Sequence, residues 1–310
     1  MTPILHHYPP SLFSEKVRVL FGYLELEWKS VIIPPIMPRP DLVPLSGGYR
    51  KTPILQVGAN IYCDTEIICR HLAKRANDAT VYGHGFNAER VARWADTELF
   101  RIVVALNFRP EAIQAQMSQM SAAGMKAFQK DRAELSAGSQ QIRLDPSAAE
   151  AQFKGLLQNL ENSLAAKFLS GDIPCIADFS LYHCLWFVGE NIANASILEC
   201  WPKIKAYRQR MANFGHGKFT QISSQEALTE GKNTEPAVPA NAEVDQSIAG
   251  DLRAGDSVTI AANDYGRNPI AGNLVSWSAN EIVILREDPE AGAIMIHAPN
   301  SGFEVAARVN

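Results

Sequence analysis

The sequence predicts an α+β protein in three parts: a mixed region of strands and helices, a helical region and a small all-β region. Three observations lead to this division. Short apolar runs bounded by Pro and Gly fill residues 1–76, which is typical of strands and short helices. Residues 88–222 carry apolar side chains at helical spacing. After a polar stretch at 223–249, which reads as a linker or a surface strap, residues 250–310 return to strand-like runs.

Composition excludes several classes of protein. The chain has 310 residues, of which 46% are hydrophobic and 20% are charged, as expected for a globular protein of two or three domains. Its net charge of -4 argues against a nucleic-acid surface. No apolar run approaches the length of a membrane span, and the N-terminus lacks the features of a signal peptide. We therefore expect a cytoplasmic protein with neither a nucleic-acid nor a membrane partner.

The cysteines indicate reduced thiols. They are odd in number, scattered along the chain and set in apolar patterns, and no two have CxxC spacing. We therefore expect no disulfide framework and no metal site. These residues are Cys63, Cys69, Cys175, Cys184 and Cys200.

The N-terminal region begins with a strand at Pro3–Tyr8 and a helix that Ser11 or Ser14 would cap. A second strand follows at Trp28–Ile33, and the proline-rich stretch Pro34–Pro44 is too broken for a long helix. A hairpin and another helix complete the region. This order of elements is typical of a thioredoxin-like fold.

The hairpin and its helix place two polar features side by side. Ile54–Val57 and Ile61–Cys63 form the hairpin, and Asp64 and Thr65 begin the next helix. Pro53 cannot donate to a sheet, which leaves the backbone of the preceding Thr52 free at an edge. An edge backbone and a helix N-terminus a hairpin's width apart are suited to a small, polar, peptide-like molecule.

Beyond residue 88 the chain is helical, and its apolar stripes predict core and dimer surfaces. Helices are expected at Glu111–Leu135, from about Cys175 to Val188 and at Trp201–Phe214. The C-terminal β region carries eight acidic and four basic residues, which disfavours binding to nucleic acid. We expect it to dock against the helical region, because about sixty residues barely cover their own apolar strands.

Two motifs resemble the glutathione S-transferase superfamily. In that family a residue followed by cis-proline precedes a hairpin, and an acidic residue with Ser or Thr opens the next helix. Thr52-Pro53 and Asp64-Thr65 match this order. The run from Ser11 to Arg18 resembles the omega-like motif with Ser in place of Cys, and zeta-like members also begin this run with Ser. The resemblance extends from residue 1 to about residue 220 and implies a thioredoxin-like domain followed by an all-α transferase domain.

The resemblance implies glutathione as co-substrate and a hydroxyl that stabilises its thiolate. Ser11 falls at the catalytic position, Tyr8 is the alternative because Tyr-type members carry their hydroxyl near the end of this strand, and Ser14 ranks third. A hydroxyl that donates to an anion contributes roughly 1.5–3 kcal/mol, enough to lower a thiol pKa by roughly one to two units. For Ser11 alone, a plain helix cap is the competing interpretation, and the two are compatible.

The resemblance also implies how glutathione is held. Asp64 would take the ammonium, Thr65 the γ-glutamyl carboxylate, and the Thr52 backbone before Pro53 the cysteinyl part. Lys51 and Arg50 are candidates for the glycyl carboxylate, with ordinary surface charges an equal alternative. The candidates for the second-substrate pocket, for which core roles stay open, are Trp94, Phe100 and Arg101.

The predicted activity is attack of the glutathione thiolate on a small hydrophobic electrophile, typical of detoxification by a homodimeric glutathione S-transferase. A glutathione-dependent isomerase is a close alternative. A non-catalytic protein that binds glutathione or a hydrophobic ligand is a further alternative of a different class. The role of the C-terminal β region and the identity of the electrophile are open.

Overall fold

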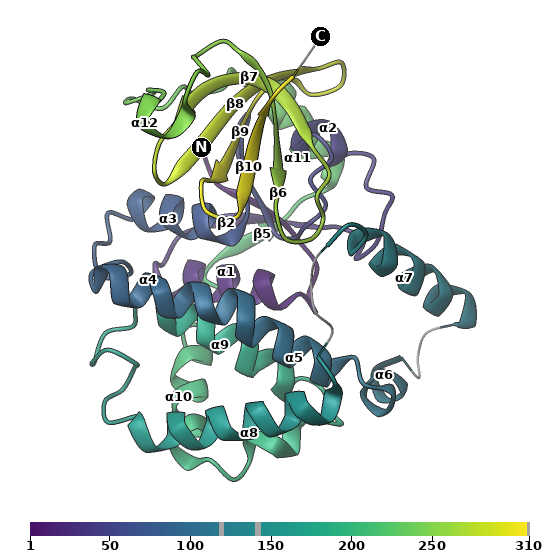
Figure 1. Ribbon diagram of the computed structural model, residues 1–310, viewed down its shortest axis with the longest axis vertical. Coiled ribbons are helices and arrows are strands. Elements are labelled where there is room, and N and C mark those ends of the chain that lie inside the picture. Colours follow the sequence, from purple (N-terminus) through teal and green to yellow (C-terminus); the bar gives the residue numbers. More distant parts are fainter. Residues whose placement is uncertain (118–120, 140–143, 309–310) are drawn as a thin grey trace.

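The computed structural model describes residues 1–117, 121–139 and 144–308 (Figure 1). The strands are β1 (Ile4–His7), β2 (Trp28–Ile32), β3 (Ile54–Val57), β4 (Asn60–Cys63), β5 (Phe219–Gln221), β6 (Ser257–Ala262), β7 (Ile270–Trp277), β8 (Glu281–Asp288), β9 (Gly292–Pro299) and β10 (Phe303–Ala307). The helices are α1 (Leu12–Tyr23), α2 (Val43–Ser46), α3 (Thr65–Arg75), α4 (Gly85–Trp94), the π-helix η1 (Ala95–Leu99), α5 (Phe100–Asn107), α6 (Pro110–Met117), α7 (Ala122–Leu135), α8 (Pro146–Ser163), α9 (Ile176–Gly189), the 3₁₀-helix η2 (Ala195–Leu198), α10 (Pro202–Ala212), α11 (Ser224–Lys232) and α12 (Gln246–Ala249).

The N-terminal region has the predicted thioredoxin-like fold. β1 pairs in parallel with β2 and antiparallel with β3, and β3 forms the expected hairpin with β4. Ser11 caps α1 by accepting a hydrogen bond from the backbone of Ser14. Asp64 caps α3 in the same way by accepting from the backbone of Glu66. Both caps satisfy backbone N–H groups that a helix start leaves unpaired.

The helical region lies on the other side of α1 from the sheet (Figure 1). α9 is its centre, because it packs against α1, α4 and α5 and is buried on nearly every side. The predicted helix at Glu111–Leu135 is divided into α6 and α7, and its residues 118–120 lie outside the described part of the chain. The region is all-α as predicted up to the end of α10. The strand β5, which follows it and pairs with β2, was not predicted.

The C-terminal strands continue the N-terminal sheet. Within the described residues, ten strands form one sheet in the order β10-β6-β7-β8-β9-β4-β3-β1-β2-β5. The junction is the parallel pairing of β9 with β4, in which Tyr62 faces His297 across the strands. The two parts also share one hydrophobic core, to which Ile54 and Ile61 contribute from one side and Ile284 and Ile296 from the other. We refer to residues 250–308 as the C-terminal β unit.

The C-terminal β unit was predicted to dock against the helical region, and its β6–β7 loop does contact Phe100 and Leu135 there. The main junction corrects this prediction, because it lies elsewhere. The unit docks on the edge strand of the thioredoxin-like region, where β9 hydrogen-bonds to β4 and covers an otherwise open sheet edge. The pairing also explains how so small a unit covers its apolar strands. A strand of a second copy could not pair at the β4 edge, because β9 occupies it.

The stretch 223–249, predicted as a linker or strap, contains α11 and α12. α11 begins with a capping box between Ser223 and Glu226 and buries Ala227 and Leu228 in the shared core. The side-chain amide of Gln56 donates to the carbonyl of Ala227 at 2.8 Å, which fixes α11 against β3. The polar composition of this stretch therefore marks a packed strap and not a free tether.

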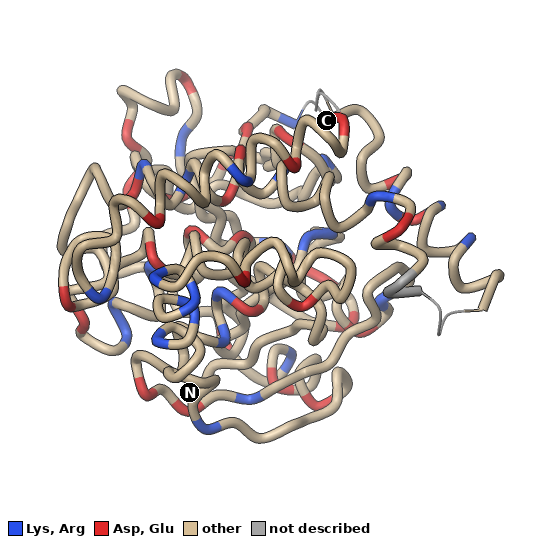
Figure 2. Tube along the Cα trace, turned by 90° about the horizontal axis from the view of Figure 1, so that it is seen from below, with Lys and Arg blue, Asp and Glu red and all other residues tan. Residues whose placement is uncertain are grey.

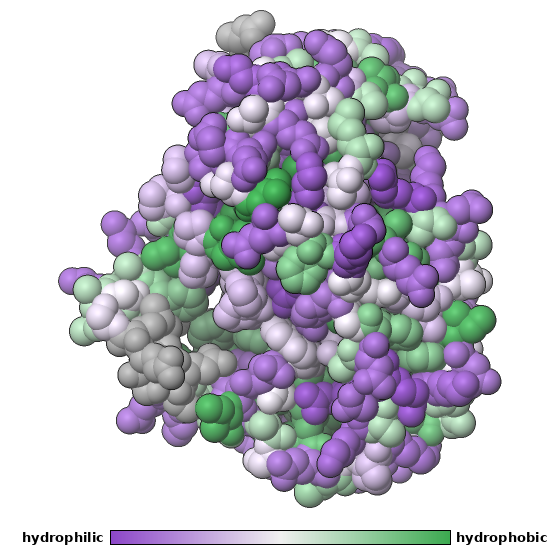
Figure 3. Space-filling model, turned by 180° about the vertical axis from the view of Figure 1, so that it is seen from behind, coloured by the Kyte–Doolittle hydropathy of each residue, from purple (hydrophilic) through white to green (hydrophobic). Residues whose placement is uncertain are grey.

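Charges are interspersed along the fold. Figure 2 shows Lys and Arg mixed with Asp and Glu over most of the trace. On the face seen in Figure 3, apolar residues occur in small groups among polar ones. Across the described residues, no helix combines the length and the apolar character that a membrane crossing requires.

Candidate functional site

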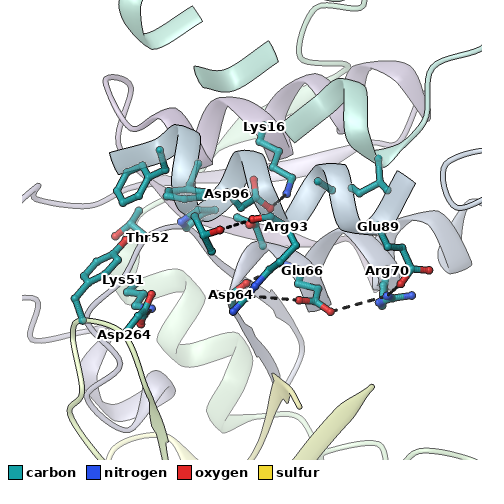
Figure 4. Close-up of a pocket in the computed structure, with 18 of the residues that line it drawn as sticks. Lys16, Lys51, Thr52, Asp64, Glu66, Arg70, Glu89, Arg93, Asp96 and Asp264 are labelled. Carbon is teal, nitrogen blue, oxygen red and sulfur yellow. Dashed lines mark hydrogen bonds and ion pairs between the residues drawn. The ribbon is translucent and has the colours of Figure 1, made fainter. Parts of the chain in front are cut away.

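A cleft lies where the thioredoxin-like region, the helical region and the C-terminal β unit meet (Figure 4). Its walls come from the first turns of α1 and α3, from α4, η1 and the start of α5, and from the loop between β6 and β7. Lys51, Thr52 and Pro53 line the cleft just before β3, and the Thr52–Pro53 peptide bond is cis. Three regions of the chain that are far apart in the sequence therefore enclose one site.

The start of α3 provides one end of the cleft. Asp64 lies there with Thr65, and its Oδ1 accepts from the backbone N–H of Glu66 at 2.9 Å. Asp64 has φ 90° and ψ 141°, a conformation that costs a non-glycine residue about 1–3 kcal/mol and occurs mostly at functional sites. The strained backbone directs a carboxylate to the positive end of a helix, inside the cleft.

Each of the other acidic residues that line the cleft forms an ion pair with a Lys or Arg side chain. Lys51 Nζ lies 2.5 Å from Asp264, and Arg70 lies 2.9 Å from Glu89 and 3.9 Å from Glu66. Asp96 pairs with Lys16. Asp64 differs, because within the described residues no Lys, Arg or His nitrogen lies within 4.0 Å of its carboxylate. The cleft thus holds one carboxylate with room for an incoming cation.

Lys16 and Asp96 form a buried ion pair within the cleft wall. Lys16 Nζ lies 2.6 Å from Asp96 Oδ2, and Asp96 Oδ1 accepts from His183 at 2.9 Å. Burial raises the pKa of Asp96, but the charge of Lys16 and the hydrogen bond from His183 outweigh it and hold that pKa at about 2. Burial lowers the pKa of His183 more than Asp96 raises it, so this imidazole is neutral at pH 7. Asp96 belongs to the π-helix η1, a distortion that is frequent at functional sites.

Comparisons with known proteins agree with this architecture. Residues 5–80 match the family model for the glutathione S-transferase N-terminal domain, and residues 120–214 match the model for the C-terminal domain. A solved structure of a GST-like protein from Pseudomonas syringae is 36% identical, with a TM-score of 0.82, over 99% of this chain and 100% of that one. The chain belongs to the glutathione S-transferase superfamily.

Two more distant structures share the fold alone. A glutathione S-transferase from Rhodospirillum rubrum F11 is 16% identical, with a TM-score of 0.50, over 68% of this chain and 88% of that one. FzlA from C. crescentus is 17% identical, with a TM-score of 0.50 and the same two coverages. No curated protein matches the chain. The GST-like protein from P. syringae also matches the region of the C-terminal β unit, since its match covers nearly the whole chain.

The cleft of this superfamily member brings together seven of the residues expected from the sequence. Arg50 is absent from the cleft lining, because its guanidinium pairs with Asp131 of α7 at 2.6 Å. Trp94 is absent as well and lines a separate apolar hollow between α4, α8 and α9. The residues in the cleft are Lys51, Thr52, Pro53, Asp64, Thr65, Phe100 and Arg101.

The hydroxyls expected to act on the thiol lie beside the cleft and not in its lining. Ser11 Oγ accepts from the backbone N–H of Ser14 at 3.3 Å, and Ser11 is only 4% exposed. Ser14 is fully buried, and its own hydroxyl has no partner among the described residues. Tyr8 is half-buried and packs against the core shared with the C-terminal β unit. In this part of α1, Phe13 and Lys16 line the cleft instead.

Among the cleft residues that sequence reasoning missed, four carry the charges and the ring on which the arguments below depend. Asp264 and Tyr265 come from the β6–β7 loop, and the ring of Tyr265 lies 6.1 Å from that of Phe100 in α5. Burial raises the pKa of Tyr265, which keeps its hydroxyl protonated. Lys16 and Asp96 complete the set. Lys16 is four residues from both Leu12 and Leu20, so it shares an apolar face of α1, which could have indicated its burial. No local pattern joins Asp264 to Lys51. No cluster that could hold a metal occurs in the described residues.

Proposed function

We propose that this superfamily member is an enzyme that transfers glutathione to a small electrophile. The observation that carries the proposal is Asp64, a carboxylate on a strained backbone with no cation beside it among the described residues. The other carboxylates of the cleft are paired. A peptide with a free ammonium supplies the missing charge. The γ-glutamyl end of glutathione carries such an ammonium next to a carboxylate.

In the proposed complex each part of glutathione has its own partner. Asp64 binds the ammonium, and the first N–H groups of α3 with the Thr65 hydroxyl bind the γ-glutamyl carboxylate, where the helix dipole favours an anion. The backbone of Thr52 pairs with the cysteinyl part. This arrangement directs the thiol towards the first turn of α1, from which Phe13 lines the cleft.

The proposed reaction is a nucleophilic substitution. The thiolate sulfur forms a bond to the electrophilic carbon, the leaving group departs with the electron pair of its bond, and the thiol proton passes to solvent. The thiolate has to be present near pH 7, and Ser11 is the proposed donor to it. Because Ser11 Oγ uses a lone pair to accept from Ser14, its hydroxyl hydrogen stays available for donation.

A second candidate function is binding of glutathione without turnover. The burial of Ser11 favours it, because a hydroxyl outside the cleft lining is poorly placed to donate to a ligand sulfur.

The homodimer expected from the resemblance stays a prediction, and light scattering measures the oligomeric state directly.

The test combines two measurements on the full-length protein. Conjugation of glutathione to an activated chloroarene reports turnover, and ultraviolet difference absorbance reports whether the bound thiol is ionised at pH 7. Turnover with a thiolate signal supports the transferase. Calorimetric binding without either signal supports the binding protein, and absence of binding contradicts both.

A further inference from the structure

The two cations that the sequence offers for the glycyl end of glutathione are already paired with carboxylates of this chain. Arg50 lies 2.6 Å from Asp131 of α7. Lys51, which lines the cleft, lies 2.5 Å from Asp264 of the β6–β7 loop, and its side chain is only 12% exposed. A ligand carboxylate at this end would therefore meet cations whose charge is already compensated.

The loop that supplies Asp264 is fixed to the other two regions of the protein. Next to Asp264, the ring centre of Tyr265 lies 4.4 Å from Lys51 Nζ, which is within range of a cation–π contact. The backbone N–H of Gly266 donates to the carbonyl of Leu135 at the end of α7, at 2.8 Å. Gly266 has φ +61° and a Cβ there would come within 3.1 Å of Leu135, so the turn requires a glycine. Asp264 is therefore presented to Lys51 by an ordered turn.

This geometry makes a ligand carboxylate unfavourable beside Lys51. A free glycyl carboxylate either displaces Asp264 into solvent or lies next to it, and in the second case two anions share one ammonium. A neutral ester or amide carbonyl behaves differently. It accepts one of the remaining N–H groups of Lys51 while the ion pair to Asp264 persists.

We propose that Asp264 is a specificity-determining residue, through which the C-terminal β unit selects a γ-glutamyl thiol peptide whose glycyl end is an ester or amide over one with a free carboxylate. The proposal rests on the proposed function, because it places the γ-glutamyl end at Asp64. It assigns the unit a role in the chemistry of the cleft as well as in the sheet. Tyr265 contributes by keeping Lys51 in position.

The experiment compares the calorimetric affinity of glutathione with that of its glycyl monoethyl ester. For the unmodified protein we expect the ester to bind about fivefold more tightly, the effect of one half-exposed ion pair. Asp264→Asn should remove this preference, because Lys51 then meets the glycyl carboxylate without a competitor. Glu304→Gln is the matched control. It removes the same charge from the same unit, but Glu304 pairs with Arg267 and not with Lys51, so the preference should persist.

The outcomes separate this proposal from the proposed function. If both ligands bind but the free acid is preferred, and Asp264→Asn leaves the ratio unchanged, the role of Asp264 is overturned and the glutathione site stands. A loss of preference in Glu304→Gln equal to that in Asp264→Asn would mean a long-range charge effect and would also overturn it. If neither ligand binds, the proposed function fails and the selectivity with it. Thermal unfolding of each variant verifies that it is folded.

Discussion

Lys16 of α1 and Asp96 of η1 are joined by an ion pair of 2.6 Å that links the two walls of the cleft. The side chain of Lys16 is 1% exposed and that of Asp96 is 16% exposed, so the pair has little solvent screening. Breaking such a pair from one side leaves an uncompensated buried charge, which typically costs 3–5 kcal/mol.

The first prediction concerns this pair. Asp96→Asn should lower the free energy of unfolding by about 3–5 kcal/mol, measured by denaturant unfolding. The double variant Lys16→Met with Asp96→Leu should lose less than Asp96→Asn alone, because it leaves no lone charge. A double variant less stable than Asp96→Asn would show that stability depends on the hydrogen bond to His183 and not on the charge balance.

The second prediction concerns pH and His6. Burial lowers the pKa of this histidine from 6.5 to about 4, against a hydrogen bond of 2.8 Å to Gln56 that raises it. As the pH falls, His6 is therefore protonated in the unfolded chain at a higher pH than in the folded protein. The stability that neutral His6 contributes is complete above pH 6.5 and is lost as the pH falls towards 4. The loss should be on the order of 3 kcal/mol, because the pKa is lowered by about 2.5 units at about 1.4 kcal/mol each. Burial also lowers the pKa of His7 and His71, so His6→Asn should reduce the pH dependence of unfolding without removing it. His84→Gln, at an exposed position, should leave that dependence unchanged.

The third prediction concerns the ligand ammonium. Asp64→Asn should weaken glutathione binding at least tenfold, because loss of the charged partner of a desolvated group costs about 2–5 kcal/mol. Asn is the matched replacement, since it also caps helices and tolerates a positive φ. The melting temperature should therefore change little. Retained affinity in calorimetry would contradict the assignment of Asp64.

The fourth prediction concerns the thiol. Ser11→Ala should raise the pKa of bound glutathione by about one to two units, read from thiolate absorbance against pH. Ser14→Ala makes the same substitution in the same turn and should leave that pKa unchanged, because the backbone N–H that Ser11 accepts is kept. If Tyr265→Phe raises the thiol pKa while Ser11→Ala does not, the activating hydroxyl comes from the C-terminal β unit.

Local sequence patterns predicted the individual helices and strands. The features that these patterns did not predict depend on contacts between residues far apart in the sequence. The hairpin at Ile54–Cys63 and the cap at Asp64 depend on neighbours within a few residues, so turn and cap chemistry identified them. The pairing of β4 with β9 joins segments more than two hundred residues apart, and strand pattern alone does not select a partner. The contact of Lys51 with Asp264 depends on that pairing, so the sequence pattern could not predict it either. The burial of Ser11 depends on tertiary packing, so its role as a cap was predictable and its exposure was not.

The last prediction concerns the C-terminal β unit as part of one cooperative structure. Truncation after Ser224 removes β9 from β4 and the strands that complete the shared core, so the protein should lose solubility or melt at a lower temperature. Ile284→Ala tests the same point in the full-length chain. Ile284 is fully buried in the unit, and its truncation to Ala should cost about 2–5 kcal/mol while calorimetry still shows one transition. Val238→Ala, at a position that is 60% exposed, should change neither quantity. Two transitions, of which only one moves in Ile284→Ala, would mean that the unit folds independently of the sheet it extends.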